Sequence, residues 1–147
     1  MSLGPRLEAI LDLLRPCTLL VDVGTDHGLV PLEAVRRGIA ARAVGVDKKH
    51  RPLDVARRNH AAAGSPPEVS FVLGDGLAGH VPDAVVIAGV GARLAMRVVD
   101  ARAMQVVVQL NAERDRFERH MTSLGFTATD VRHVGPFQVT RYGKLDA

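Results

Sequence analysis

Residues 21–28, with the sequence VDVGTDHG, constrain the fold of this chain more than any other stretch. An apolar strand with an acid inside it runs into a glycine turn, and a helical pattern follows directly. Open α/β sheets build nucleotide-cofactor sites in this way, at the carboxyl end of the first strand. Gly24 and Gly28 allow the backbone to turn sharply and to approach a ligand closely. Asp26 stands where a G-x-G-x-x-G dinucleotide fingerprint has glycine, so the turn departs from that pattern.

Length and composition indicate one soluble globular domain. The chain has 147 residues, of which 47% are hydrophobic and 24% charged, enough apolar content for a core. No apolar run approaches the ~18 residues that span a bilayer, and no signal-peptide pattern opens the chain. The single cysteine, Cys17, excludes an internal disulfide framework and argues against a zinc cluster. We therefore expect a cytoplasmic protein with no membrane segment and no metal.

The basic residues are unevenly spread over the chain. The formal net charge is +3 and the pI is about 9.6, and many of the arginines and lysines lie between residues 36 and 58. Such a region either steers nucleic acid toward the protein or forms solvated helix faces, and charge alone leaves both open. Only 3% of the residues are aromatic, with no Trp and one Tyr, which leaves few platforms for base stacking.

Hydrophobic periodicity predicts strands that alternate with helices along most of the chain. The expected helices are 3–15, 32–37, 52–63, 94–99 and 112–124, and the expected strands are 19–23, 43–46, 69–73, 84–88 and 104–110. This alternation predicts an α/β fold with a parallel sheet and right-handed crossovers. Two further strands in residues 126–142 predict a C-terminal hairpin that adds an antiparallel strand. No repeat, linker or low-complexity segment interrupts the pattern, so we expect one domain over residues 1–147.

Acidic residues lie at or near the ends of three predicted strands: Asp22, Asp26, Asp47 and Asp75. Because ligands bind outside the carboxyl ends of strands in open α/β sheets, we expect these acids to converge on one crevice. Asp47 follows Gly28 by 19 residues, the spacing at which an acid binds ribose hydroxyls. Asp75 is placed to accept from an adenine amino group. Each acid taken alone also suits a helix cap or a turn.

The acidic turn separates two cofactors that an acid at Asp47 would suit equally well. The pyrophosphate of NAD needs backbone N–H groups at a helix N-terminus, and Asp22 and Asp26 would repel it. S-adenosylmethionine has no phosphate, and it carries an ammonium and a sulfonium that carboxylates attract. Charge therefore favours S-adenosylmethionine and disfavours an NAD-dependent oxidoreductase.

Four segments closely resemble the TrmK family of bacterial tRNA (adenine-N1) methyltransferases, which modify adenine 22 of tRNA. They are VDVGTDHGLVP at 21–31, GVDKKHRPLDVARRN at 45–59, LGDGL at 73–77 and VVIAGVGARL at 85–94. The resemblance implies a Rossmann-like class I S-adenosylmethionine-dependent methyltransferase with a mainly parallel seven-stranded sheet. It also implies a soluble RNA-binding enzyme of tRNA processing, with tRNA as its partner and an open oligomeric state.

The resemblance implies cofactor contacts at several of the strand ends. The expected cofactor residues are Asp22, Gly24, Thr25, Asp26, Gly28, Asp47, Lys48, Asp75, Gly76 and Ala88. The chain departs from the family in the run 89–92, where alanine replaces a glycine, and at Gln109-Leu110-Asn111, where the family has Gln-Pro-Asn. Family members also continue into a helical C-terminal domain, whereas this sequence ends at Ala147, so we expect a short member of the family.

Methylation of adenine N1 requires the N1 lone pair to lie in line behind the methyl group, so positioning should dominate catalysis. A paired base must first be extruded from the RNA. The loop 88–92 is where related enzymes clamp the target base, and Asp26, His27, Gly89 and Asn111 are the candidate catalytic residues. His27 could instead bond to the backbone at a helix start, and Asn111 could instead cap the following helix.

Two further alternatives remain open from the sequence. Arg93 and Arg97, one helical turn apart after the clamp loop, suit phosphate contacts and solvated helix charges equally well. The protein as a whole could also be a cofactor-binding remnant or accessory subunit without its own RNA methyltransferase turnover.

Overall fold

The computed structural model describes residues 3–144, in which seven strands form one sheet flanked by helices. The helices are α1 (Pro5–Leu13), α2 (Leu29–Arg36), α3 (His50–Ala62), α4 (Ala92–Val98) and α5 (Arg114–Ser123). The strands are β1 (Cys17–Val23), β2 (Ala40–Asp47), β3 (Val69–Leu73), β4 (Ala84–Val90), β5 (Gln105–Leu110), β6 (Phe126–Val134) and β7 (Phe137–Lys144). Residues 1–2 and 145–147 of the expected domain lie outside this description. Within 3–144 no helix has the length and apolar content to cross a membrane.

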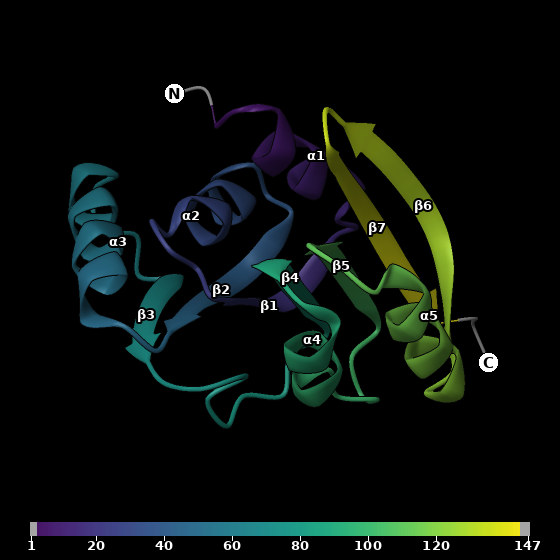
Figure 1. Cartoon of the computed structure of the whole chain (residues 1–147). Helices are drawn as coiled ribbons and strands as arrows, with labels where there is room; N and C mark the ends of the chain where they lie inside the picture. Colours follow the sequence, from purple (N-terminus) through teal and green to yellow (C-terminus); the bar gives the residue numbers. More distant parts are fainter. Residues whose placement is uncertain (1–2, 145–147) are drawn as a thin grey trace.

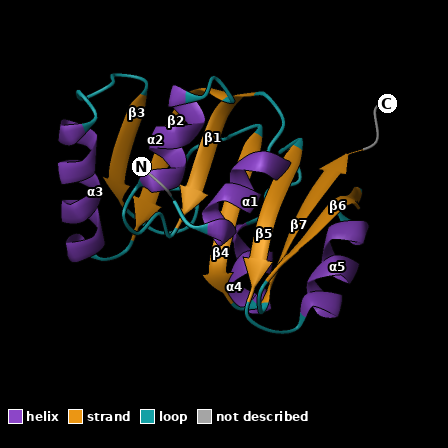
Figure 2. Cartoon of the chain, turned by 90° about the horizontal axis from the view of Figure 1, so that it is seen from above, coloured by secondary structure: helices purple, strands orange, loops and turns teal. Residues whose placement is uncertain are grey.

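The sheet has the order β3-β2-β1-β4-β5-β7-β6. Strands β1 to β5 are parallel, and β7 inserts antiparallel between β5 and β6. Figure 2 shows the parallel strands ending at one edge of the sheet while β7 runs the opposite way. The predicted α/β fold, with a mainly parallel seven-stranded sheet and an antiparallel terminal strand, is confirmed.

Helices cover both faces of the sheet (Figure 1). Helices α1, α2 and α3 lie over one face, and α4 and α5 lie over the other. Strand β4 shows why both faces need cover. Val85 and Ile87 pack into the core beneath α4 and α5, while Ala84 and Val86 pack into the core beneath α1 and α2. A strand buried on both faces reads as a continuous apolar run, as 84–88 does in the sequence.

Several predicted boundaries shift by a few residues. Strand β1 begins at Cys17 instead of Leu19 because its N–H donates to the carbonyl of Ile39, 2.8 Å away, and extends the pairing with β2. Helix α2 begins directly after Gly28, three residues earlier than predicted, so Pro31 lies inside the first turn where it has no N–H bond to lose. Helix α5 begins at Arg114 with Glu113 at its N-cap, so the alternative in which Asn111 caps this helix is wrong.

Two glycines let helix α2 and the turn before it approach the sheet. A Cβ atom at Gly45 would lie 2.6 Å from the Phe71 ring and 2.6 Å from the Thr25 hydroxyl. A Cβ atom at Gly28 would lie 2.6 Å from the same ring and 2.9 Å from the Ala56 Cβ. Gly28 also has a φ of 73°, in the left-handed region. The space that these glycines leave is filled by one aromatic ring.

The structure predicts that Gly28→Ala destabilises the fold more than the matched substitution Gly38→Ala. Both glycines have nearly the same positive φ, 73° and 74°, so both variants carry the left-handed strain of about 1–2 kcal/mol. Only position 28 adds a steric clash, because nothing lies within 4 Å of a Cβ at Gly38. Overpacking of this kind costs a further ~1–3 kcal/mol. Urea unfolding of the two variants measures the difference, and equal losses would contradict this account.

Candidate active site

The turn that follows β1 is held in place by the end of β2. The backbone N–H groups of Gly24 and Thr25 both donate to the carbonyl of Val46, at 2.8 and 3.0 Å. The turn passes through three residues with positive φ, namely Gly24 at 72°, Asp26 at 55° and Gly28 at 73°. A positive φ at Asp26 is tolerated because Asp is among the residues that visit the left-handed region most readily. The turn therefore presents Asp26 on a fixed backbone.

The Asp47 carboxylate joins this turn to the one that follows β2. One oxygen, Oδ2, accepts from the N–H of Asp26 at 3.2 Å, and the other, Oδ1, accepts from the N–H of Lys49 at 3.0 Å. A carboxylate oxygen has a second lone pair, so each can still accept from a ligand hydroxyl. Asp47 is thus both a turn-forming residue and an available acceptor at the strand edge.

A cavity of about 580 Å³ opens beside these turns, at the carboxyl ends of the parallel strands. The turn after β1 and the turn after β2 form one side, and the end of β4 with Gly89 and Val90 forms another. Helix α1 covers it with Arg6, Leu7 and Ile10. This is the crevice in which open α/β sheets bind their ligands.

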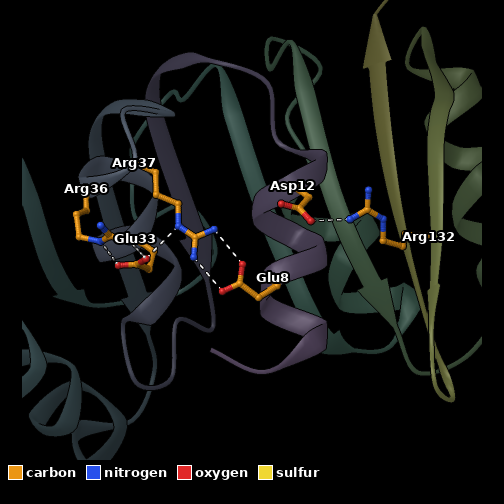
Figure 3. A network of polar contacts seen from close by, with 6 residues as sticks. All are labelled: Glu8, Asp12, Glu33, Arg36, Arg37 and Arg132. Carbon is orange, nitrogen blue, oxygen red and sulfur yellow. Dashed lines mark hydrogen bonds and ion pairs between the residues drawn. The ribbon is translucent and has the colours of Figure 1, made fainter. Parts of the chain in front are cut away.

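Ion pairs hold α1 across its two neighbours (Figure 3). Glu8 pairs with Arg37 beside α2 at 2.9 Å, and Asp12 pairs with Arg132 of β6 at 2.7 Å. These pairs are partly exposed and screened by solvent, so each contributes little to stability. The larger share of the attachment comes from Ile10 and Leu11, which are fully buried against the sheet. Helix α1 is therefore a packed roof over the cavity.

The cavity brings together eight of the residues predicted for the site. They are Asp22, Gly24, Thr25, Asp26, His27, Asp47, Ala88 and Gly89. The remaining predicted residues lie elsewhere. Gly28 packs against Phe71, and Lys48 pairs with Asp75 at 3.2 Å on an exposed part of the surface one strand further out. Gly76 follows Asp75 with a φ of 58°, and Asn111 lies beyond the end of β5.

Asp22 is the most unusual ionisable group of the cavity. Asp22 lies on β1, between β2 and β4, lines the cavity and is only 5% exposed. Burial raises the pKa of Asp22 to about 7, and the nearby carboxylates of Asp47 and Asp26 act in the same direction. The buried Thr25 hydroxyl lies beside this carboxyl and acts in the opposite direction, lowering its pKa. A buried acid beside a buried hydroxyl on one wall of the cavity indicates a site built for a polar ligand.

His27 and Asn111 differ from the alternatives raised for them. The His27 imidazole is half-exposed and lies 3.8 Å from the Asp26 carboxylate, and within residues 3–144 it makes no hydrogen bond to the backbone. It is the carbonyl of His27 that is bonded, by the Asn59 amide at 2.9 Å. The Asn111 amide donates to the carbonyl of Gly89 at 3.0 Å, which ties it to the loop after β4.

Sequence reasoning missed two residues of this region, Arg6 and Gln109. The Arg6 guanidinium lines the cavity and donates to the Gln109 side chain at 3.1 Å, across 103 residues of sequence. No local sequence pattern predicts a contact between residues so far apart in the chain. Gln109 did leave a signal, because a glutamine near the end of the apolar run VVVQL must find partners when the strand is buried.

Comparison with known proteins agrees with this geometry. Residues 3–135 match the family described as "Methyltransferase domain". The chain belongs to this methyltransferase family. Over 105 residues the methyltransferase chain is 29% identical to the tRNA (adenine(22)-N(1))-methyltransferase of Bacillus subtilis, an alignment that covers 69% of this chain and 44% of that protein. The chain thus spans less than half the length of this curated relative.

Solved structures with the same fold cover nearly all of the methyltransferase chain. The B. subtilis tRNA methyltransferase TrmK superposes with a TM-score of 0.86 at 21% identity, over 99% of this chain and 68% of that one. M. capricolum TrmK in complex with S-adenosyl-homocysteine gives 0.86 at 19% identity, over 98% and 70%. A Streptococcus pneumoniae protein in complex with S-adenosyl-L-methionine gives 0.86 at 23% identity, over 99% and 76%. At these identities the likeness shows the fold.

The raised pKa of Asp22 predicts that Asp22→Asn stabilises the ligand-free methyltransferase, and more so at higher pH. The folded state holds a proton on this acid up to about pH 7, whereas the unfolded chain releases it near pH 4. Stability contributed by Asp22 therefore falls as pH rises from 4 to 7 and stays low above. The Asn variant lacks this loss, so its advantage should reach a few kcal/mol, because a tenfold change in proton affinity is worth about 1.4 kcal/mol. Urea unfolding at pH 5 and pH 8 measures it.

Asp54→Asn is the matched control, because Asp54 lies on the exposed side of α3. The effect of this substitution on the free energy of unfolding should be small, because the side chain is exposed. An Asp22→Asn variant whose stability relative to the parent does not change between pH 5 and pH 8 would contradict the assignment.

Proposed function

We propose that this chain is an S-adenosylmethionine-dependent methyltransferase that transfers a methyl group to N1 of an adenine in tRNA. The observation that carries the proposal is the set of three carboxylates, Asp22, Asp26 and Asp47, along the cavity at the strand ends. Membership of the methyltransferase family and the cofactor complexes of proteins with this fold support the same reading.

The residues around the cavity suit the charges of S-adenosylmethionine. Asp47 would accept from the ribose hydroxyls, and Asp22 and Asp26 would face the ammonium and sulfonium. Arg6 and Lys49, which also line the cavity, would face the cofactor carboxylate. The buried Thr25 hydroxyl lines the same cavity and would offer a further polar contact. When bound, the cofactor supplies the electrophilic methyl group, and the protein orients it.

The acceptor base would lie against the loop after β4. Adenine N1 is itself the nucleophile, so the protein must mainly align it and exclude other geometries. Two carbonyls of this loop already accept hydrogen bonds from Asn111, that of Gly89 from the side chain and that of Val90 from the backbone N–H at 2.9 Å. Asp26 and His27, whose side chains are more than half exposed at the cavity, are the polar groups left to meet the exocyclic amine.

The proposed RNA contacts rest on chemistry and on the curated relative together. The name of the B. subtilis relative specifies adenine 22 of tRNA as its target. Arg93 and Arg97 are exposed on α4 directly after the clamp loop, where a phosphate backbone would pass. The cytoplasm, in which tRNA is modified, is the compartment that this function requires.

The cofactor assignment predicts measurable binding of S-adenosylmethionine that Asp47→Ala and Asp26→Ala abolish or weaken at least tenfold. Asp47→Ala removes the ribose acceptor and also two bonds to the turns. Asp26→Ala removes charge at the cavity and places alanine at a positive φ, whereas Asp26→Asn removes the charge without that strain and should weaken binding in the same direction. Isothermal titration calorimetry measures all three, with Asp54→Ala as the control that should bind as the parent does. Absence of binding by the parent protein at millimolar cofactor would refute the proposal.

The substrate assignment predicts transfer of methyl from S-adenosylmethionine to unmodified tRNA. Nucleoside analysis of the tRNA before and after incubation should show new 1-methyladenosine, and tRNA with adenine 22 replaced should not. Arg93→Ala should raise KM for tRNA severalfold without changing cofactor affinity, because a phosphate contact stabilises RNA binding only. Cofactor binding without any transfer to RNA would instead identify the chain as an accessory subunit.

A further inference from the structure

Two buried glutamines stand out in the otherwise apolar strand β5. Gln105 and Gln109 are 4% and 2% exposed, and both side chains point toward α1. Gln105 pairs with the backbone of Arg15, just after α1, accepting from its N–H at 3.0 Å and donating to its carbonyl at 2.8 Å. Gln109 accepts from Arg6 near the other end of α1. The roof helix is thus tied to one strand by an amide at each end.

Gln109 also holds the loop that follows β4. Its Oε1 accepts from the N–H of Gly89 at 3.0 Å in addition to the bond from Arg6. Its Nε2 donates to Oδ1 of Asn111 at 3.3 Å, and Nδ2 of Asn111 donates to the carbonyl of Gly89 at 3.0 Å. Both polar groups of Gly89 are therefore engaged by side chains of one neighbouring segment.

Packing does not fix Gly89, so these hydrogen bonds must. The residue is exposed, has a φ of 74° and lies at the register shift between Ala88 and Val90. The Arg6 guanidinium, at 3.5 Å, is the one group among the described residues within 4 Å of where a Cβ would be. Glycine has the widest conformational freedom of any residue, so without the amide bonds this peptide would sample several orientations.

The Arg6 side chain is held by a second contact besides its bond to Gln109. Its guanidinium lies over the Phe137 ring, 5.4 Å from the centroid, in the geometry of a cation–π contact. One oxygen of Gln109 therefore joins the helix that covers the cofactor cavity to the loop at which the acceptor base would lie.

We propose that Gln109 is a positioning residue for methyl transfer. It holds Gly89 in one orientation and keeps that loop in register with α1, so that the proposed cofactor and acceptor sites keep a fixed separation. This inference rests on the proposed function. In-line transfer depends steeply on geometry, and a misplacement of about 1 Å costs about 100-fold in rate.

The test compares Gln109→Met with Gln105→Met in the full chain. Methionine keeps the length of the side chain but removes the amide. The two positions lie on the same strand, are equally buried and both face α1. We expect Gln109→Met to lower kcat about 10- to 100-fold, with KM for tRNA and Kd for S-adenosylmethionine within about threefold of the parent. Gln105→Met should lose a similar amount of thermal stability but keep kcat within about threefold.

Two further variants separate positioning from general damage. Gln109→Glu keeps an oxygen for Gly89 and Arg6 but loses the donor to Asn111, so it should retain more of kcat than Gln109→Met. Asn111→Ala removes the bond to the Gly89 carbonyl from an exposed position, which keeps the test available if Gln109→Met does not fold. It should lower kcat in the same direction.

Amide hydrogen exchange gives a readout that does not depend on activity. In ¹⁵N-labelled protein the Gly89 N–H should lose protection at least tenfold in Gln109→Met and keep it in Gln105→Met. Unchanged protection of Gly89 would overturn the inference, as would a kcat loss of equal size in both methionine variants. A parent protein that binds cofactor but methylates no RNA would instead refute the proposed function, and the exchange result would then decide the role of Gln109 by itself.

Discussion

One carbonyl oxygen, that of Val46, accepts hydrogen bonds from the N–H groups of both Gly24 and Thr25, and the shape of the cavity depends on these two bonds. These bonds join the turn after β1 to the end of β2, and the turn passes through a positive φ at Gly24 and at Asp26. The Asp47 carboxylate then holds the following N–H group, that of Asp26. Hydrogen bonds to backbone N–H groups thus fix the positions of Asp26 and Asp47, which little packing surrounds. Polar groups fixed in this way before a ligand binds need not rearrange to meet it.

The opposite side of the cavity is held by different forces. Helix α1 is fixed by burial of apolar side chains, to which the ion pairs of Figure 3 add little because they are partly exposed and screened. The two glutamines of β5 contribute differently, because a buried amide left without partners costs ~1–3 kcal/mol. Such bonds select one placement of α1 among several that apolar packing alone would accept. Burial of apolar side chains thus stabilises α1 on the sheet, and the two amides determine its position there.

The sequence predicted the parts of this molecule that local patterns encode. Alternating apolar runs and helical periods predicted the parallel sheet. Of the four acids predicted to meet at the strand ends, Asp22, Asp26 and Asp47 line one cavity. Asp75 follows β3, one strand further out than Asp47, and it pairs with Lys48 instead of lining the cavity. Strand order alone does not show how far along the sheet edge the cavity extends. Arg6 and Gln109 were missed since 103 residues separate them and only the tertiary packing of α1 joins them. For Asn111 the sequence left a contact to the base and a helix cap open, because its partner in the fold, Gly89, belongs to another strand.

The carboxylates of the cavity repel one another, and a positively charged ligand would reduce this repulsion. Three carboxylates share one small opening, and the innermost of them, Asp22, holds its proton to about pH 7 because burial disfavours its charged form and so raises its pKa. A scaffold selected for stability alone would place an apolar side chain there, as it does at Leu20 and Val86 on the same face of the sheet. A bound cation would lower the pKa of Asp22 and release this proton near neutral pH. The turn VDVGTDHG therefore combines a backbone held by hydrogen bonds with a buried acid whose ionised form a positively charged ligand would favour.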